Sequence, residues 1–213
     1  MKLGRLLQSL WIAIIILALL VHCEHRGCQR SEVKLPTLGQ VPAFNLVAQD
    51  GHAFSQHKLK GKVWVANFVF TRCPTICPVL TRSLASVQTQ FTDEASDVHF
   101  MSFSVDPKHD SPQDLKAFAK EHQVNLSNWT FVTGEYNALR DAIVKGFKLS
   151  MGEPVALEGG GYNILHATHF VLVDQHGKIR GYYRHEPDAL KKLSQAMRSL
   201  LARPPRPAHN PSS

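Results

Sequence analysis

The sequence contains no internal repeat and no dense run of lysine and arginine with interleaved aromatic residues. The missing basic run argues against nucleic-acid binding, although the formal net charge is +7. Part of that charge lies near the two ends of the chain, and the remaining excess suits an exported domain that faces an anionic lipid surface or an acidic partner. At 213 residues and 44% hydrophobic composition, the chain has room for one domain with a real core plus appendages.

No small-x-small cleavage site follows Val21, where a largely apolar run over residues 6–21 ends. Basic residues precede this run, so a cytoplasmic amino terminus is expected. We therefore interpret residues 1–30 as a retained single-pass signal anchor, which places the rest of the chain on the periplasmic face of an inner membrane or the equivalent exported face. A cleaved signal sequence is the alternative. Lipidation at Cys23 is disfavoured because His22 is not small.

Strand and helix patterns alternate from residue 42 to residue 201 and predict a mixed α/β sheet that begins with a β-hairpin. Residues 31–41 are expected to be a linker, and residues 202–213 a disordered tail. Residues 149–163 include three consecutive glycines and are expected to form a mobile loop. The predicted strands span residues 43–47, 52–54, 63–70, 98–105, 129–132, 168–174 and 178–183, and the predicted helices begin at the first cysteine after residue 70, at Ser111, and at residues 135 and 187.

A pair of cysteines lies in Thr71-Arg72-Cys73-Pro74-Thr75-Ile76-Cys77-Pro78, between a buried strand and a helix. Helix N-termini have unpaired N–H groups that favour negative charge, so thiolates are stabilised there. At helical spacing Cys73 and Cys77 share a face, with Cβ atoms roughly 5–6 Å apart. That gap is wide for a disulfide, whose Cβ atoms lie about 3.5–4.5 Å apart. The pair, at the first strand-to-helix turn as in thioredoxin, therefore predicts a metal site first and a redox site second.

A histidine is the expected third donor. Two thiolates bind Cu(I), and an added imidazole makes a trigonal site that also holds Cu(II). Among the 12 histidines, His166 and His169 are the candidates, because a flexible loop precedes them and the others lie in turns, strand edges or tails. Zinc could occupy the same ligands with an open fourth position.

Three segments of the chain resemble the Sco/SenC family of membrane-anchored thioredoxin-like copper proteins. They are residues 70–78, residues 104–112 with the sequence Ser-Val-Asp-Pro-Lys-His-Asp-Ser-Pro, and His166, which lies eight residues before Asp174 in a predicted strand. The resemblance covers residues 42–201 and implies a thioredoxin-like fold. The predicted amino-terminal anchor also fits the layout of the family.

The resemblance implies copper ligands at Cys73, Cys77 and His166, with Asp106 as an acidic residue beside the site. His169 would point to the opposite strand face from His166, so His166 is preferred. Family members usually have aspartate immediately before the histidine, where this chain has Leu165. Because outer groups orient the imidazole and set metal affinity, copper affinity or redox poise is expected to differ from that of typical relatives.

The function that the resemblance implies is that of a copper chaperone, which delivers Cu(I) or Cu(II) to the CuA centre of a cytochrome c oxidase subunit during assembly. The alternative is a thiol–disulfide oxidoreductase that reduces the cysteines of the recipient, in which Cys73 attacks and Cys77 resolves. Thioredoxin-type reductases place a cis-proline before the hairpin strand, but no proline lies between Pro154 and Pro187, which argues against a general reductase.

Two further readings of the cysteines are disfavoured. A peroxidase would need Thr-x-x-Cys, whereas Thr71 lies two residues before Cys73, and a purely structural disulfide across so short a loop would constrain the unfolded chain little. The second pair, Cys23 and Cys28, follows the predicted anchor and is interpreted as a bystander disulfide, with copper collection as the alternative.

Overall fold

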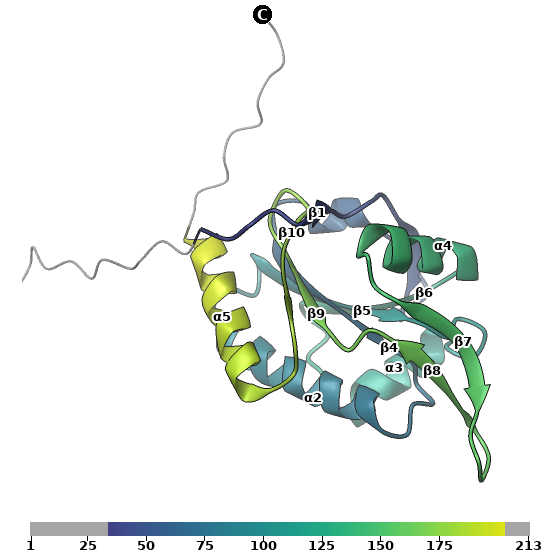
Figure 1. Cartoon of the computed structure of the whole chain (residues 1–213). Helices are drawn as coiled ribbons and strands as arrows, with labels where there is room; N and C mark the ends of the chain where they lie inside the picture. Colours follow the sequence, from purple (N-terminus) through teal and green to yellow (C-terminus); the bar gives the residue numbers. More distant parts are fainter. Residues whose placement is uncertain (1–33, 203–213) are drawn as a thin grey trace, which may run out of the picture. The chain divides into compact units, whose positions relative to one another are not determined.

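The computed structural model describes residues 34–202, shown in colour in Figure 1. Its strands are β1 (Gly39–Gln40), β2 (Asn45–Ala48), β3 (Ala53–Ser55), β4 (Val63–Val69), β5 (Val98–Ser104), β6 (Trp129–Thr133), β7 (Met151–Ala156), β8 (Tyr162–His166), β9 (Phe170–Val173) and β10 (Lys178–Tyr183). Its helices are η1 (Gln56–Leu59), α2 (Ile76–Gln88), η2 (Thr89–Phe91), α3 (Pro112–Glu121), α4 (Tyr136–Arg140), η3 (Asp141–Gly146) and α5 (Pro187–Leu201).

Eight strands form the main sheet in the order β1-β10-β9-β4-β5-β6-β2-β3, while β7 and β8 form a separate two-stranded sheet. The central strands β4, β5 and β6 are parallel, so their carboxyl ends meet at one edge of the sheet. All seven residues of β4 are buried, as its unbroken apolar sequence predicts. In Figure 1, α2, α3 and α5 lie on one side of the main sheet and α4 on the other. The predicted mixed α/β sheet is confirmed.

Local sequence signals located several elements correctly. The predicted amino-terminal hairpin is β2 and β3, in antiparallel register. Ser111 caps α3 through a capping box with Asp114, and proline follows at the first helical position. The four apolar residues that recur at helical spacing after the cysteines are all buried, and they are Leu80, Leu84, Val87 and Phe91.

The mobile loop predicted over residues 149–163 is wrong for most of its length, because this segment forms the hairpin of β7 and β8. Its three glycines have positive φ angles of 92°, 100° and 79° and make the turn that joins the two strands. The strand predicted over residues 168–174, which the family resemblance extends back to His166, is likewise interrupted. It ends as β8 at His166, and the chain then crosses residues 167–169 to join the main sheet as β9.

The helix predicted over residues 135–147 is present, but only its first part is α-helical. The second part, η3, is a π-helical turn. Gly146 ends this turn against the amino-terminal segment, where an added Cβ would lie 2.5 Å from Cδ of Pro42. Glycine is therefore required for this close approach.

Part of the predicted linker over residues 31–41 lies against the main sheet. The Leu38 N–H donates to the Ile179 carbonyl at 2.9 Å, and β1 continues this contact by pairing with β10. The predicted anchor over residues 1–30 and the predicted tail beyond residue 202 lie outside the described residues. Within residues 34–202, no helix has the length and apolar character needed to cross a membrane.

Candidate functional site

The two cysteines lie where β4 leaves the sheet and α2 begins. Cys77 is the second residue of α2, whereas Cys73 lies in the preceding turn, with its N–H bonded to the Phe70 carbonyl at 3.2 Å. The prediction that both occupy helical positions is therefore half wrong, because Thr75, at the start of the helix, has non-helical backbone angles. The sulfurs still meet the helix terminus as expected, since the Cys77 N–H donates to Cys73 Sγ at 3.4 Å. Neither Cys73 nor Cys77 forms a disulfide.

The acidities of the two cysteines differ widely. A hydrogen bond from the Cys77 thiol, assisted by backbone N–H groups of Cys77, Thr75 and Ile76, lowers the pKa of Cys73 to about 5 despite burial. The pKa of Cys77 is raised, first because its thiol is the donor in that bond, then because it is buried near the negative charges of Cys73 and Asp110. At neutral pH the pair is therefore one thiolate, Cys73, and one thiol.

This asymmetry predicts a measurable pH dependence. In a reduced chain with Cys23 and Cys28 replaced by serine, ultraviolet absorbance should report one thiolate that appears with a midpoint at about pH 5. Because the pKa is depressed, this thiolate is present above the midpoint and is lost as the pH falls through it. In Cys77→Ala the midpoint should rise toward the ordinary value of 9.0. A midpoint near 9 in the parent chain would contradict the assignment.

His166 approaches the cysteines from the end of β8. Its side chain is buried, and its Nε2 lies 3.7 Å from Cys77 Sγ. Its Nδ1 lies 3.0 Å from the carbonyl of Ala167, so a proton on Nδ1 leaves the Nε2 lone pair directed at the thiol. The pKa of His166 is lowered, chiefly by burial, which favours the neutral imidazole that binds metals. The ring also packs edge-on against Phe70, with centroids 6.0 Å apart.

The distance between Cys77 and His166 fits a shared ion. An ion with bonds of about 2.3 Å to sulfur and about 2.0 Å to nitrogen holds those atoms about 3.5–3.7 Å apart at angles of about 110–120°. The observed separation of 3.7 Å matches this range. Within residues 34–202, however, no three His, Cys, Asp or Glu side chains already stand together at metal-ligand spacing. Cys73 Sγ accepts from the Cys77 thiol and so lies beside this pair, and the three side chains would have to adjust to surround one ion.

Comparison with known proteins identifies the family. A family model described as SCO1/SenC matches residues 36–202. The chain belongs to the SCO1/SenC family. The SCO1 protein homolog of Bacillus subtilis (strain 168) is 36% identical over 154 residues, which is 72% of this chain and 78% of that protein.

Solved structures agree with this membership. BsSco, described as a member of the Sco family of cytochrome c oxidase assembly proteins with a disulfide switch, is 33% identical with a TM-score of 0.68, over 79% of this chain and 96% of that one. Bradyrhizobium japonicum ScoI with copper bound has a TM-score of 0.67 at 20% identity, over 76% of this chain and 99% of that one, which shows the fold alone. The predicted Sco/SenC resemblance and thioredoxin-like fold are confirmed.

Asp106, the acidic residue that the SCO1/SenC resemblance places beside the site, is buried after β5. It accepts hydrogen bonds from Tyr162 of β8, and its carboxylate oxygens lie 3.0 Å from Nδ1 of His109. Among the hydrogen bonds of the described residues, none joins Asp106 to Cys73 or Cys77. Its link to the site runs instead through the strand that carries the histidine.

A second carboxylate, that of Asp110, contacts the segment that leads into the cysteines, although the sequence did not single it out. It is fully buried and accepts hydrogen bonds from the Thr71 N–H at 3.1 Å, the Thr71 hydroxyl at 2.7 Å and the Ser104 hydroxyl at 2.6 Å. Burial raises its pKa, although these hydrogen bonds act in the opposite direction. Asp110 thereby fixes the segment that leads into Cys73. Its presence in the same SCO1/SenC segment as Asp106 was the only sequence signal.

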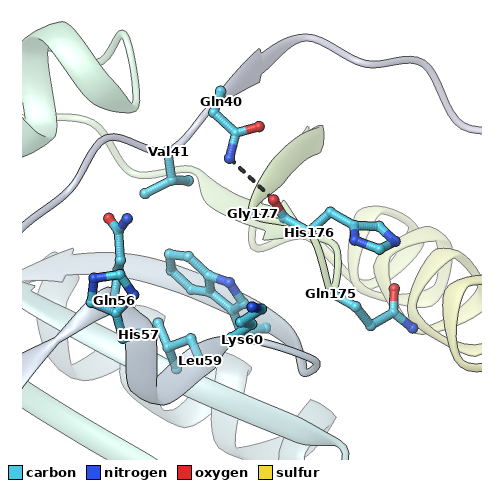
Figure 2. Close-up of a pocket in the computed structure, with 10 residues that line it drawn as sticks. Gln40, Val41, Gln56, His57, Leu59, Lys60, Gln175, His176 and Gly177 are labelled. Atoms are coloured by element: carbon cyan, nitrogen blue, oxygen red, sulfur yellow. Dashed lines mark hydrogen bonds between the residues drawn. The ribbon is translucent and has the colours of Figure 1, made fainter. Parts of the chain in front are cut away.

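Two cavities of this SCO1/SenC protein lie away from the cysteines. A cavity of about 420 Å³ lies at the carboxyl ends of β5 and β6, with Asp106 and Lys108 in its wall. Another, of about 350 Å³, is shown in Figure 2, where Gln40 donates to the His176 carbonyl at 3.1 Å beside its rim. Neither cavity is lined by Cys73, Cys77 or His166.

Proposed function

We propose that this chain is a metallochaperone that binds copper through Cys73, Cys77 and His166 and delivers it to the CuA centre of cytochrome c oxidase during assembly. The observation that carries the proposal is the 3.7 Å approach of His166 Nε2 to Cys77 Sγ beside the Cys73 thiolate. Soft thiolates select Cu(I), and the neutral imidazole adds the donor that Cu(II) needs. Zinc is the chemical competitor, because the same donors suit it.

Reversible binding suits delivery rather than storage. Because the three side chains have to adjust to surround one ion, the ligand set closes around copper only on loading. Cys73, Cys77 and His166 are all buried, so the loaded site has to open before an incoming cysteine of the recipient can take the place of one ligand. A named relative supports the oxidase as recipient, since BsSco is described as a member of the Sco family of cytochrome c oxidase assembly proteins.

The proposed location is the periplasmic face of the inner membrane, or the equivalent exported face. It is supported by the sequence of residues 1–30, with basic residues before an apolar run. In this arrangement the thioredoxin-like domain meets a membrane-bound oxidase subunit on the same side of the membrane.

Leu165, which stands where family members usually have aspartate, points away from the site. Its side chain is 74% exposed, whereas the flanking Ile164 and His166 are buried. The hydrogen-bond partner that orients His166 is instead the Ala167 carbonyl, at 3.0 Å. The imidazole of His166 therefore keeps a hydrogen-bond partner although this chain lacks the aspartate.

This orientation gives a prediction that differs from the sequence expectation of altered affinity. Because exposed substitutions usually change free energies by no more than about 0.5 kcal/mol, Leu165→Asp should change Cu(I) and Cu(II) affinity by less than about threefold. Competition titrations with chelators measure both constants. Val155→Asp, on the partner strand and 63% exposed, is the matched control. A change of tenfold or more at Leu165 alone would show that its side chain faces the metal.

A specific observation also favours the second candidate function, a thiol–disulfide oxidoreductase acting on the recipient. The low pKa of Cys73 makes it a nucleophile at neutral pH. Its thiolate would attack a recipient disulfide, forming a mixed disulfide and releasing one recipient thiolate. Cys77, after losing its proton, would attack Cys73 Sγ and release the second thiolate. The recipient is then reduced, and Cys73 and Cys77 are oxidised to a disulfide.

One experiment separates the two functions. The copper-loaded chain is mixed with the reduced CuA-site subunit, and the copper-free, reduced chain is mixed with the same subunit in its disulfide form. A metallochaperone transfers copper in the first mixture, which the CuA absorption spectrum reports, and a zinc-loaded chain gives no such spectrum. Thiol release in the second mixture without transfer in the first would establish the oxidoreductase and overturn the proposal.

A further inference from the structure

The strand that carries His166 belongs to a hairpin outside the main sheet. β7 and β8 pair only with each other, so backbone hydrogen bonds of the main sheet do not fix their position. Within β8, Ile164 and His166 are buried and Tyr162 is half-buried, while the alternate residues Asn163 and Leu165 are exposed. The placement of His166 therefore depends on what the inward side chains of β8 contact.

Tyr162 makes a polar contact from this inward face. Its hydroxyl donates a hydrogen bond to the buried Asp106 carboxylate and lies 3.1 Å from His109 Nδ1. Its ring stacks on Phe70, with centroids 6.0 Å apart and an interplanar angle of 19°. The same Phe70 ring meets His166 edge-on, so one aromatic ring contacts both ends of the inward face. Tyr162 and His166 are thereby held against a common surface.

The acceptor of this bond is itself anchored in the domain. The Asp106 N–H donates to Ser104 Oγ at 3.0 Å, and the Ser104 hydroxyl donates to Asp110 at 2.6 Å. Asp110 in turn holds Thr71, two residues before the first cysteine. A continuous chain of hydrogen bonds therefore runs from the hairpin to the segment that leads into the cysteines.

We infer that Tyr162 is a positioning residue for His166: its hydroxyl, bonded to Asp106, holds the β7–β8 hairpin so that Nε2 of His166 stays beside Cys77. The inference deepens the proposed copper site and rests on it where copper is the readout. Phe70 supplies the apolar half of the contact. The Asp106 carboxylate thus acts on the site through the hairpin, which gives a physical role to the residue that the sequence singled out.

Tyr162→Phe in the full chain tests the inference, because it removes the hydroxyl and keeps the stacked ring. Loss of a hydrogen bond to a buried carboxylate should make hydrogen exchange of the β8 amides about tenfold to hundredfold faster in the metal-free protein. Cu(II) affinity, which needs the imidazole, should fall about 10- to 100-fold, while Cu(I) affinity changes less than about threefold. The melting temperature of the main domain should change little.

Tyr136→Phe is the matched control. Its hydroxyl also donates to a hairpin carboxylate, that of Glu153 at 2.7 Å, but this bond is exposed. This variant should leave β8 exchange and both copper affinities within about threefold of the parent. Asp106→Ala, which removes the acceptor, should reproduce the effect of Tyr162→Phe on β8, and the double variant should add little to either effect, because the two residues share one bond.

The readouts separate failure of this inference from failure of the proposed function. A parent chain that binds no copper would refute the copper site, yet β8 exchange would still decide the role of Tyr162. Unchanged β8 exchange in Tyr162→Phe, or equal losses of Cu(I) and Cu(II) affinity, would overturn the inference. Equal effects of Tyr136→Phe and Tyr162→Phe would overturn it as well.

Discussion

Replacing either Cys73 or Cys77 with alanine should lower Cu(I) affinity by about 100- to 1000-fold. Four-ligand zinc sites provide about 10–16 kcal/mol in total, or about 2.5–4 kcal/mol per ligand, and each 1.4 kcal/mol is tenfold in affinity. Cu(I) depends on soft thiolates more than on any other donor in this site. Competition against a Cu(I) chelator measures the loss, in chains with Cys23 and Cys28 replaced by serine.

The two cysteine variants should also differ in acidity, because only one of them keeps the Cys73 sulfur. In Cys77→Ala, Cys73 loses the thiol that donates to it, so its pKa rises and the remaining Cu(I) affinity should fall further as the pH is lowered from 8 to 6. Ser86→Ala, an exposed position farther along α2, is a control that should leave Cu(I) affinity unchanged. Retention of parental Cu(I) affinity by both cysteine variants would exclude the thiolates as ligands.

Replacing His166 with alanine should weaken the binding of Cu(II) much more than the binding of Cu(I). Cu(II) affinity should fall about 100- to 1000-fold by the same estimate per ligand, and the absorption that arises from thiolate-to-Cu(II) charge transfer should disappear. Cu(I) affinity should stay within about tenfold of the parent, because both thiolates remain and can hold Cu(I) without the imidazole. Absorption spectra and chelator competition in both oxidation states measure this split.

His169→Ala is the control for the histidine variant. His169 lies only three residues further along the chain and was the other candidate in the sequence, but only His166 approaches Cys77. The His169 variant should keep the Cu(II) absorption and the parental affinity. Loss of Cu(II) absorption in His169→Ala, with retention in His166→Ala, would reverse the assignment of the third ligand.

The central part of the fold could be predicted because its signals are local. β4 is a continuous apolar run, the cysteines follow it directly, and the residues after them recur at helical spacing. These patterns depend on neighbours in sequence rather than on distant contacts, so the strand, the turn and the helix were located correctly. The detail that Cys73 stands outside the helix was missed, because Pro74 is compatible with either a turn or a first helical turn.

The hairpin that carries His166 was hidden by its glycines. Three consecutive glycines indicate flexibility in a sequence, yet here they make a tight turn with positive φ angles. The alternation of Tyr162, Ile164 and His166 with exposed residues was a strand signal that the glycine run obscured. A period of two over five residues is too short to outweigh such a run.

The polar network around the site could not be predicted, because its members come from three separate segments. Asp110 meets Thr71 across 39 positions, and Tyr162 meets Asp106 across 56. No short-range pattern in the sequence indicates contacts between residues so far apart. The sequence could name Asp106 only by family resemblance, and the structure assigns its contact to the hairpin rather than to the cysteines.

X-ray absorption spectroscopy of the copper-loaded chain tests the central claim most directly, because it counts the donor atoms around the ion. The account predicts two sulfur donors and one imidazole nitrogen around Cu(II), with the imidazole contribution lost in His166→Ala and both sulfurs retained. A spectrum without sulfur donors, or an imidazole contribution that persists in His166→Ala, would contradict it.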